Sequence, residues 1–380
     1  MTALRVALDV TAVPPNPAGA GRYTLELAVA LARREDIDLV AVSRRHDVDR
    51  WRHLGGTVVP AAPSARPLRL AWEQAVLPAV LRRVRPAVHH GPHYTMPERA
   101  RLPIAVTIHD CTFFDHPEWH ERSKVLLFRR AITVAARRAA VLVCVSATTA
   151  RRLGELVRVE APVVVAPHGV DHARFGPEPA DRAADEAAVR RLGIPPGRPF
   201  VCFVGTMEPR KNVPGLVQAF DRMAAAHPDA LLVLAGMPGW GGDAVARAVA
   251  AVERHRDRVV QTGYVPDDAV PALLRSATVV AYPSLSEGYG LPALEALACG
   301  APLVTTAGTA MAELAGEAAV LVPPGDVGAL AEALDGLLAA GRGARAVEDR
   351  RRQGLAIAAG RTWDASAARH VEAYRRATGA

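Results

Sequence analysis

The feature that most constrains this 380-residue chain is an alternation of strands and helices that runs through the sequence twice. Short runs rich in Val, Leu and Ile alternate with segments of helical periodicity, which predicts parallel sheets with helices on both faces. In the first half we expect strands at residues 4–10, 39–43, 87–90, 104–108, 141–145 and 163–166, and helices at 22–34, 68–84, 122–138 and 147–157. Such a series is typical of a doubly wound, Rossmann-like domain.

Residues 172–198 interrupt the alternation and are rich in Pro, Gly, Asp and Glu, which predicts a linker with one short helix. The pattern then restarts, with strands expected at 200–204, 231–235, 258–261, 279–282 and 303–305, and helices at 213–226, 243–255, 267–275 and 291–299. The sequence therefore predicts an α/β protein with an N-terminal domain at 1–171 and a C-terminal domain at 199–362. A final helix within 363–380 follows Gly360 and is a candidate to cross back to the first domain.

Composition restricts the setting of the protein. Half of the residues are hydrophobic and 22% are charged, as in globular proteins. No apolar run approaches the roughly 20 residues that span a bilayer, and Asp9 interrupts the first apolar run, unlike a signal peptide. The four cysteines form no CxxC pair, and Cys144 and Cys202 lie in apolar runs where reduced thiols are expected. We therefore expect a cytoplasmic protein.

The net charge of +7 comes almost entirely from arginine, since only Lys124 and Lys211 are lysines among 46 basic residues. We interpret the basic excess as a solvated surface and expect no nucleic-acid partner. The positions of the two lysines are considered separately, because a lysine supplies a compact point charge whereas arginine supplies a planar guanidinium group.

The loop after the expected strand at 200–204 reads G-T-M-E-P-R-K-N and opens a helix. Arg210 and Lys211 lie at the start of that helix, where free N–H groups and the helix dipole favour an anion. Two cations placed there indicate that a negative group binds between them, because the dipole alone disfavours positive charge. A phosphate or diphosphate clamp explains the pair, and an ordinary surface turn is the alternative.

The loop after the expected strand at 279–282 reads E-G-Y-G-L-P-A-L-E. Gly288 and Gly290 let the backbone approach a ligand closely, and Pro292 fits the first turn of a helix. Glu295, expected in that first turn, is either a capping carboxylate or a ligand contact. Glu287 precedes the helix and has no capping role, so we interpret the two glutamates as acceptors of hydrogen bonds from sugar hydroxyls.

Two further loops follow expected strands of the first half. His109 ends the strand at 104–108, either as a structural histidine or as a site residue. Gly19 and Gly21 precede the helix at 22–34, where glycines let the backbone approach a ligand closely, although a lone G-x-G carries little information by itself. Residues 16–21 form a mobile loop in the alternative interpretation.

The E-x7-E pattern, the upstream G-x4-R-K loop and the two Rossmann-like halves together resemble the retaining GT-B glycosyltransferases of family 4. Four further segments resemble its O-antigen mannosyltransferase-like branch: G-A-G-R-Y at 19–23, V-T-I-H-D at 106–110, H-P-E-W-H at 116–120 and H-G-V-D at 168–171. The resemblance covers essentially the whole chain. One departure is His168, which stands where the family more often has Asn.

The resemblance implies two domains that face a central cleft, and roles for individual residues. Glu287 would contact the donor sugar, Glu295 the nucleotide ribose, and Arg210 with Lys211 the diphosphate. His109 would contact the transferred hexose or the leaving phosphate. The remaining candidates for donor binding are Gly19, Gly21, Gly205, Tyr264, Val265, Gly288, Tyr289, Gly290 and Leu291.

The implied activity is metal-independent transfer of a hexose, with retention of configuration, from a GDP- or UDP-sugar to a glycan, lipid-linked or natural-product acceptor. The resemblance favours GDP-mannose, and no cofactor is expected. His89 and His90 would point to opposite faces of a strand, so the cluster that they form with His93 is not expected to bind a metal. No D-x-D pair lies in a suitable loop.

Two other functions are weighed against this one. A dinucleotide-dependent oxidoreductase needs G-x-G-x-x-G after a strand, and neither residues 19–21 nor the glycine-rich stretch 236–242 has that spacing. A non-catalytic sugar-nucleotide-binding protein remains the alternative, and the presence of both glutamates and both cations argues against it.

The expected helix at 122–138 carries six basic residues and no acid, interleaved with Leu, Phe, Ile and Val. A basic amphipathic helix can bind anionic lipid, which would suit a lipid-linked acceptor and a peripheral position at the inner face of the membrane. An ordinary core-packing helix with a charged face is the alternative.

Overall fold

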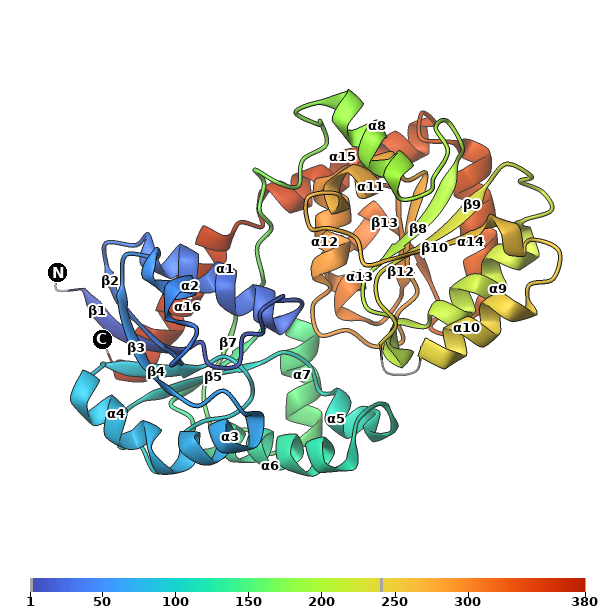
Figure 1. Ribbon diagram of the computed structural model, residues 1–380. Helices are drawn as coiled ribbons and strands as arrows, with labels where there is room; N and C mark the ends of the chain where they lie inside the picture. The colour runs from blue at the N-terminus through green and yellow to red at the C-terminus, as the bar shows by residue number, and fades with distance from the viewer. Residues whose placement is uncertain (1–2, 240–241, 380) are drawn as a thin grey trace. The chain divides into compact units, whose positions relative to one another are not determined.

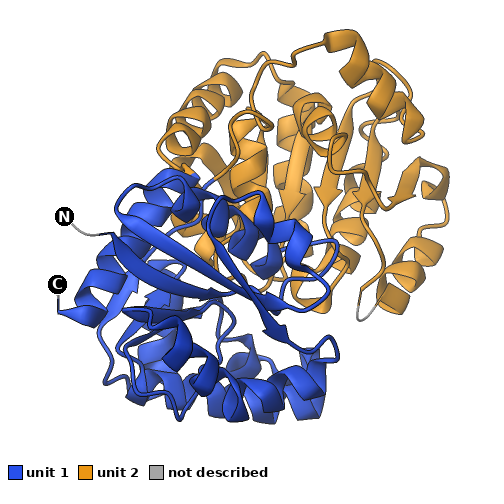
Figure 2. Cartoon of the chain, turned by 60° about the vertical axis from the view of Figure 1, so that its left-hand side comes forward, with its two compact units in different colours: residues 1–169, 363–380 blue, residues 170–362 orange. Residues whose placement is uncertain are grey.

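The computed structural model describes residues 3–239 and 242–379, which form two compact units. Unit 1 comprises residues 1–169 and 363–380, and unit 2 comprises residues 170–362, as the colours of Figure 2 show. Trp240 and Gly241, which belong to the glycine-rich stretch 236–242, lie outside the described residues. Both units contain a fully parallel sheet, which confirms the doubly wound architecture expected from the alternating pattern.

Unit 1 is built on a seven-stranded sheet with the order β3-β2-β1-β4-β5-β6-β7. Its strands are β1 (Leu4–Asp9), β2 (Ile37–Arg44), β3 (Thr57–Ala62), β4 (Val88–Gly91), β5 (Ile104–Ile108), β6 (Val141–Cys144) and β7 (Val163–Val165). Its helices are α1 (Ala20–Ala32), α2 (Val48–Arg52), α3 (Arg66–Ala75), α4 (Leu77–Val84), α5 (Thr112–Asp115), α6 (Arg122–Arg138), α7 (Ala147–Leu156) and α16 (Trp363–Thr378), with a short 3-10 turn, η1 (Pro117–Trp119).

The two faces of this sheet are covered by different helices (Figure 1). One face packs against α1 and α16, through residues such as Val6, Leu8 and Val143. The opposite face packs against α3 and α4 near β1, and against α6 and α7 near β5 and β6. Alternate residues of each strand point to opposite faces of the sheet, and both faces are covered by helices, as is usual for a parallel sheet.

Unit 2 is built on a six-stranded sheet with the order β10-β9-β8-β11-β12-β13. Its strands are β8 (Phe200–Val204), β9 (Leu231–Ala235), β10 (Val259–Gly263), β11 (Val279–Tyr282), β12 (Leu303–Thr306) and β13 (Ala319–Val322). Its helices are α8 (Arg182–Arg191), α9 (Val213–Met223), α10 (Gly242–Ala251), α11 (Val270–Ser276), α12 (Leu291–Ala298), α13 (Ala310–Ala315), α14 (Val327–Ala340) and α15 (Arg345–Ala359), with 3-10 turns η2 (Pro209–Lys211), η3 (Arg256–Arg258) and η4 (Gly316–Ala318).

The structure departs from the predicted elements at a few places. The helix expected at 68–84 is two helices, α3 and α4, which meet at Val76 because Pro78 disfavours a continuous helix there. The edge strands β3 and β13 were not predicted; β3 contains Pro60, which an edge strand tolerates. Helices α14 and α15 were also missed. Helix α8 is the short helix expected within the linker.

The last helix, α16, lies on the sheet of unit 1 beside α1, and its inner face joins the core. Ala367, Val371 and Tyr374 of α16 are buried in the same cluster as Val6 and Leu27. A chain of side-chain hydrogen bonds, called here the buried polar chain, also joins α16 to the sheet. Its members are Tyr374, His90, Thr107, Tyr23 and His370, and it ends on the carbonyl oxygen of Ser366.

Burial lowers the pKa of the histidines that belong to the buried polar chain or pack against Tyr23. The pKa of His370 falls to about 4, and the pKa values of His90, His109 and His168 are also lowered, chiefly by burial. A histidine kept neutral in the folded state binds its proton only in the unfolded state, so acid favours unfolding. Glu73 has the opposite effect on stability, because burial raises the pKa of its carboxyl group to about 7. Between about pH 4.5 and 7 the folded state binds this proton and the unfolded state does not, so acid favours folding there.

We therefore expect unit 1 to lose stability as the pH falls below about 6.5, because the buried histidines outnumber the one carboxyl group that acts in the opposite direction. Each buried histidine contributes about 1.4 kcal/mol per pH unit until its folded-state pKa is reached. His370→Gln should reduce the slope of the unfolding free energy against pH by about that amount between pH 6 and 5. Urea titrations at several pH values measure this slope, and an unchanged slope in the variant would contradict the prediction. His227→Gln, which removes a histidine of unit 2, is the matched control.

Candidate functional site

The loops with the most distinctive chemistry leave the sheet of unit 2 side by side. Strand order reverses between β8 and β11, which are adjacent parallel strands. In a doubly wound sheet, ligands bind beyond the carboxyl ends of the strands at this reversal. The loop after β8 carries Arg210 and Lys211, and the loop after β11 carries Glu287.

An ion pair between Arg210 and Glu287 joins the two loops. The backbone N–H of Leu285 also donates to the carbonyl oxygen of Arg210, at 2.7 Å. Arg210 makes a second ion pair with Glu208, whose Oε2 lies 2.8 Å from Nε. Both Arg210 and Glu287 are partly buried, with 25% and 14% of their side chains exposed, so this pair is only moderately screened by water. The structure thus brings a cation of one loop and a carboxylate of the other to one point.

Lys211 lies near the end of the β8 loop, next to Arg210, and its ammonium group reaches back to Gly205 at the start of the loop. A Cβ atom built on Gly205 would lie 2.7 Å from the Lys211 Nζ, so the ammonium group packs directly against the backbone of Gly205. Gly205 also has a φ of +141°, which side-chain-bearing residues rarely adopt. The pKa of Lys211 is lowered, first by burial and then by the charge of Arg210. The charge of an anionic ligand would raise this pKa again and favour the protonated ammonium group.

Helix α12 begins directly after the β11 loop. Gly290 caps it with a φ of +99°, and a Cβ there would collide with Met311, so only glycine fits. Leu291 is the first residue of the helix, and Pro292 the second. Glu295 was expected in the first turn of this helix; the structure corrects this, because Glu295 is the fifth residue and lies one turn further along.

The other predicted donor-site residues of unit 2 lie in the same two loops or after β10. Gly288 and Tyr289 are buried, and burial raises the pKa of the Tyr289 hydroxyl. Tyr264 and Val265 follow β10, which stands two strands from β8 in the sheet. Tyr264 is 58% exposed whereas Val265 is buried, so the two side chains do not form one surface.

In unit 1, the glycine loop leads directly into α1. Gly19 is the N-cap of α1 with a φ of +50°, and the helix begins at Ala20. Gly21 was expected before the helix but lies in its first turn, where a Cβ atom would come within 3.0 Å of Pro14. The glycine at this position thus lets residues 14–17 pack closely on the helix start.

His109 follows β5 and is buried among rings. Its Nε2 lies 2.7 Å from the carbonyl oxygen of Pro92, which can only accept a hydrogen bond, so Nε2 carries the proton. Burial lowers the pKa of His109, which keeps the ring neutral and leaves Nδ1 as a hydrogen-bond acceptor. Tyr23 contacts its ring edge-on, with centroids 5.0 Å apart. A neutral nitrogen of this kind can accept a hydrogen bond from a hydroxyl group.

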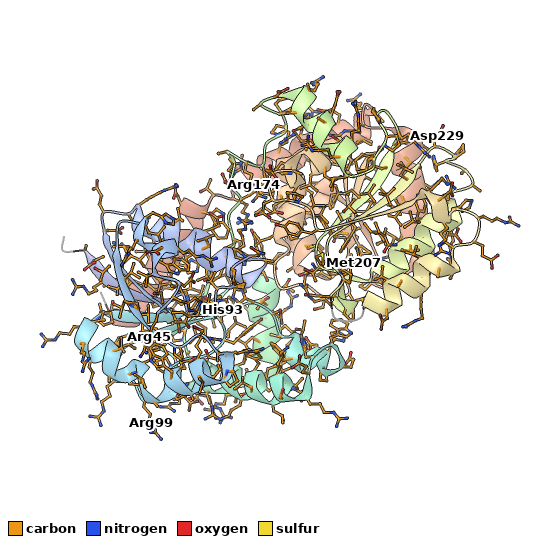
Figure 3. All side chains as sticks on the ribbon, in the orientation of Figure 1. Arg45, His93, Arg99, Arg174, Met207 and Asp229 are labelled. Carbon is orange, nitrogen blue, oxygen red and sulfur yellow. The ribbon has the colours of Figure 1, made fainter. Side chains whose placement is uncertain are left out.

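The remaining histidines are distributed over different surroundings. His90 faces α16, whereas His89 pairs in register with Ala7 and points to the other face, as expected. His93 lies inside unit 1, in contrast to Arg99 on its outer side (Figure 3). The ring of His168 stacks on Trp363, at 5.8 Å, and packs against Tyr23. Among residues 3–239 and 242–379, no group of three His, Cys, Asp or Glu side chains is placed to hold a metal ion.

Two site residues were not predicted from the sequence. Glu208 pairs with Arg210, and Ser284 Oγ donates to Glu287 Oε1 at 3.4 Å. Both lie in the two loops that follow β8 and β11, and their place in these loops was the only sequence feature that could have indicated them. Each contact is local, since Glu208 is two residues from Arg210 and Ser284 is three residues from Glu287.

The helix with the basic sequence, α6, makes several internal contacts. Arg130 and Arg138 pair with Glu98, and Lys124 pairs with Glu121. These contacts neutralise part of the positive charge of α6. In the part of the chain that the structure describes, no helix is both long and apolar enough to cross a membrane.

Comparison with known families agrees with this arrangement. Residues 17–174 match the family model described as Glycosyltransferase Family 4, and residues 185–354 match the model described as Glycosyl transferases group 1. The first match lies within unit 1 apart from its last residues, and the second lies within unit 2.

Individual relatives belong to the same class. The chain is 28% identical to "O-antigen chain mannosyltransferase B" of Escherichia coli, over 82% of this chain and 84% of that protein. It is 37% identical to the 2-deoxystreptamine N-acetyl-D-glucosaminyltransferase of Streptomyces fradiae, over 52% of this chain and 46% of that protein.

Solved structures share the fold at low sequence identity. Sucrose-phosphate synthase from Thermosynechococcus elongatus superposes with a TM-score of 0.79 at 21% identity, over 98% of both chains. Anabaena HepE in complex with UDP-glucose superposes with a TM-score of 0.75 at 17% identity, over 97% of this chain and 99% of that one. The chain therefore consists of a Glycosyltransferase Family 4 domain followed by a Glycosyl transferases group 1 domain, and it has the GT-B fold.

Proposed function

We propose that this protein is a retaining glycosyltransferase that moves a hexose from a nucleotide-diphosphate sugar to a glycan, lipid-linked or natural-product acceptor. The observation that carries the proposal is the Arg210–Glu287 ion pair at the strand-order reversal of unit 2, next to Lys211, whose ammonium group packs against Gly205. We favour GDP-mannose as donor because the relative aligned over most of the chain is named a mannosyltransferase. A UDP-sugar is the alternative, since HepE was solved with UDP-glucose.

The ion pair fits the chemistry of such a donor. In a nucleotide sugar the hexose is bonded to the diphosphate, so the group that holds the sugar must lie beside the group that holds the phosphate. Glu287 and Arg210 are neighbours in this way. Arg210 and Lys211 would bind the diphosphate and stabilise the negative charge that develops on it as the glycosidic bond breaks. Glu295, further along α12, would bind the ribose.

We propose that Glu287 positions the sugar and does not attack it as a nucleophile. Glu287 is held by Arg210 and Ser284, which suits a carboxylate that orients sugar hydroxyls. The leaving phosphate would take the acceptor proton on the same face of the sugar, and no metal or other cofactor is required. His109, neutral with Nδ1 as acceptor, would bind a hydroxyl of the transferred hexose rather than the phosphate.

We also propose a peripheral contact with anionic lipid at the inner face of the membrane, through one side of α6. Arg122, Leu126, Arg130 and Arg137 follow one another at spacings of four, four and seven residues and share one stripe of the helix. Leu126 is 73% exposed, and Arg122 and Arg137 are exposed as well. An apolar side chain flanked by cations can insert among lipid headgroups.

The proposed binding of the donor diphosphate by Arg210 and Lys211 is tested by substitution of the two lysines of the chain. Lys211→Ala should abolish the rise in melting temperature that GDP or UDP causes in the wild-type protein, because the ammonium group beside Gly205 is lost. Lys124→Ala, which removes the other lysine, should keep the full rise. A thermal-shift series with UDP-, GDP-, ADP- and dTDP-sugars measures this and identifies the preferred base. An undiminished shift in Lys211→Ala would contradict the clamp.

The role of Glu287 is tested by Glu287→Gln, which keeps the shape and removes the charge. We expect transfer to fall at least about a hundred-fold, since a group that contacts the reacting sugar is weakened. Mass spectrometry of the wild-type protein with donor should show no glycosyl adduct on Glu287. A trapped covalent adduct would overturn the assignment. Absence of any donor turnover by the wild-type protein, with binding intact, would favour the non-catalytic alternative.

The lipid contact is tested by sedimentation with vesicles that contain phosphatidylglycerol, at low and high salt. The double variant Arg122→Glu, Arg137→Glu should lose binding that the wild-type protein shows at low salt. Arg247→Glu with Arg254→Glu changes the net charge equally on exposed positions of unit 2 and is the matched control. Equal binding by the two double variants would rule out α6 as the contact.

A further inference from the structure

The buried polar chain connects the last helix of the protein with the surroundings of His109. Tyr374 and His370 lie on α16, His90 on β4, Thr107 on β5 and Tyr23 on α1. The links are all short: Tyr374 Oη to His90 Nδ1 is 2.8 Å, His90 Nε2 to Thr107 Oγ1 is 2.7 Å, Thr107 Oγ1 to Tyr23 Oη is 2.8 Å and Tyr23 Oη to His370 Nε2 is 2.7 Å. All five side chains are fully buried.

The end of this chain fixes the direction of every hydrogen bond in it. His370 Nδ1 lies 2.7 Å from the carbonyl oxygen of Ser366, which can only accept, so Nδ1 carries the proton. The ring is neutral because burial lowers its pKa to about 4, so Nε2 accepts. Tyr23 must then donate its one hydroxyl hydrogen to His370, and accept from Thr107.

The same argument continues to the other end. Thr107 donates to Tyr23 and therefore accepts from His90 Nε2. His90 is neutral because burial keeps its pKa well below the usual range, so its Nδ1 accepts from the Tyr374 hydroxyl. Each group uses its only available hydrogen, so a break at Tyr23 leaves two buried partners without a hydrogen bond.

Tyr23 is also the residue of the buried polar chain whose ring contacts His109. Its ring meets His109 edge-on, with centroids 5.0 Å apart and planes at 81°. It meets His168 as well, with centroids 4.7 Å apart. The hydroxyl is held by Thr107 and His370, so the ring cannot turn away from His109 without breaking two buried hydrogen bonds.

We propose that Tyr23 is a positioning residue for His109, and that His370 on α16 anchors Tyr23 in that role. The last helix of the chain thereby sets the orientation of a proposed sugar-contacting residue that lies far from it in the sequence. The inference rests on the proposed function only where it concerns the hexose. The orientation of His109 itself can be measured without any activity.

Kinetics of matched variants test the proposal. Tyr23→Phe keeps the ring and removes its anchor, and we expect kcat to fall about ten-fold with KM for donor and acceptor nearly unchanged, because misplacement affects the reacting geometry. His370→Phe should do the same. His370→Gln should stay close to wild type, because its side-chain oxygen can still accept from Tyr23. Tyr374→Phe loses one hydrogen bond at the far end of the chain, and should keep kcat within about two-fold.

Nitrogen-15 NMR of the histidine rings gives a readout that needs no substrate. We expect the proton on Nδ1 in His370 and on Nε2 in His90, and we expect the His109 ring signals to move in Tyr23→Phe but not in Tyr374→Phe. Opposite tautomers, or a stationary His109 signal in Tyr23→Phe, would overturn the proposal. So would equal losses of kcat in Tyr23→Phe and Tyr374→Phe. A wild-type protein without transferase activity would instead refute the proposed function and leave the NMR result standing.

Discussion

The reversal of strand order between β8 and β11 is the constraint on which the candidate site depends. Because these strands are parallel and adjacent, loops that lie far apart in the sequence leave the sheet at the same edge. The Arg210–Glu287 ion pair and the bond from Leu285 to Arg210 then hold the two loops together. The sheet topology therefore brings the proposed phosphate-binding and sugar-binding residues together, and the contacts between their side chains then hold them in place.

The central strands could be predicted because a parallel strand buried on both faces is a continuous apolar run, as in the all-buried β9. Edge strands carry less of this signal. β3 contains Pro60 and exposed positions, and β13 is only a short segment with Leu321 exposed. Pro78 was visible in the sequence, but periodicity continues across it, so one helix was expected where the structure has two.

For the site, the sequence was informative where a rare residue type stands in a strand-exit loop. Lys211 and the acid pair were found in this way. Ser284 and Glu208 were not, although each contacts a residue of its own loop, because neither residue type is rare in this sequence. The buried polar chain was out of reach for a different reason: Tyr23 and His370 are 347 residues apart, and nothing local to either predicts the contact.

The docking of α16 has a consequence for synthesis of the protein. The core of unit 1 includes Ala367, Val371, Ala373 and Tyr374, so that core is incomplete while the ribosome is still translating unit 2. Unit 2 is continuous in sequence and can close as soon as it emerges. The first domain to be made would thus be the last to be finished, with apolar surface on its sheet uncovered until the final helix leaves the exit tunnel.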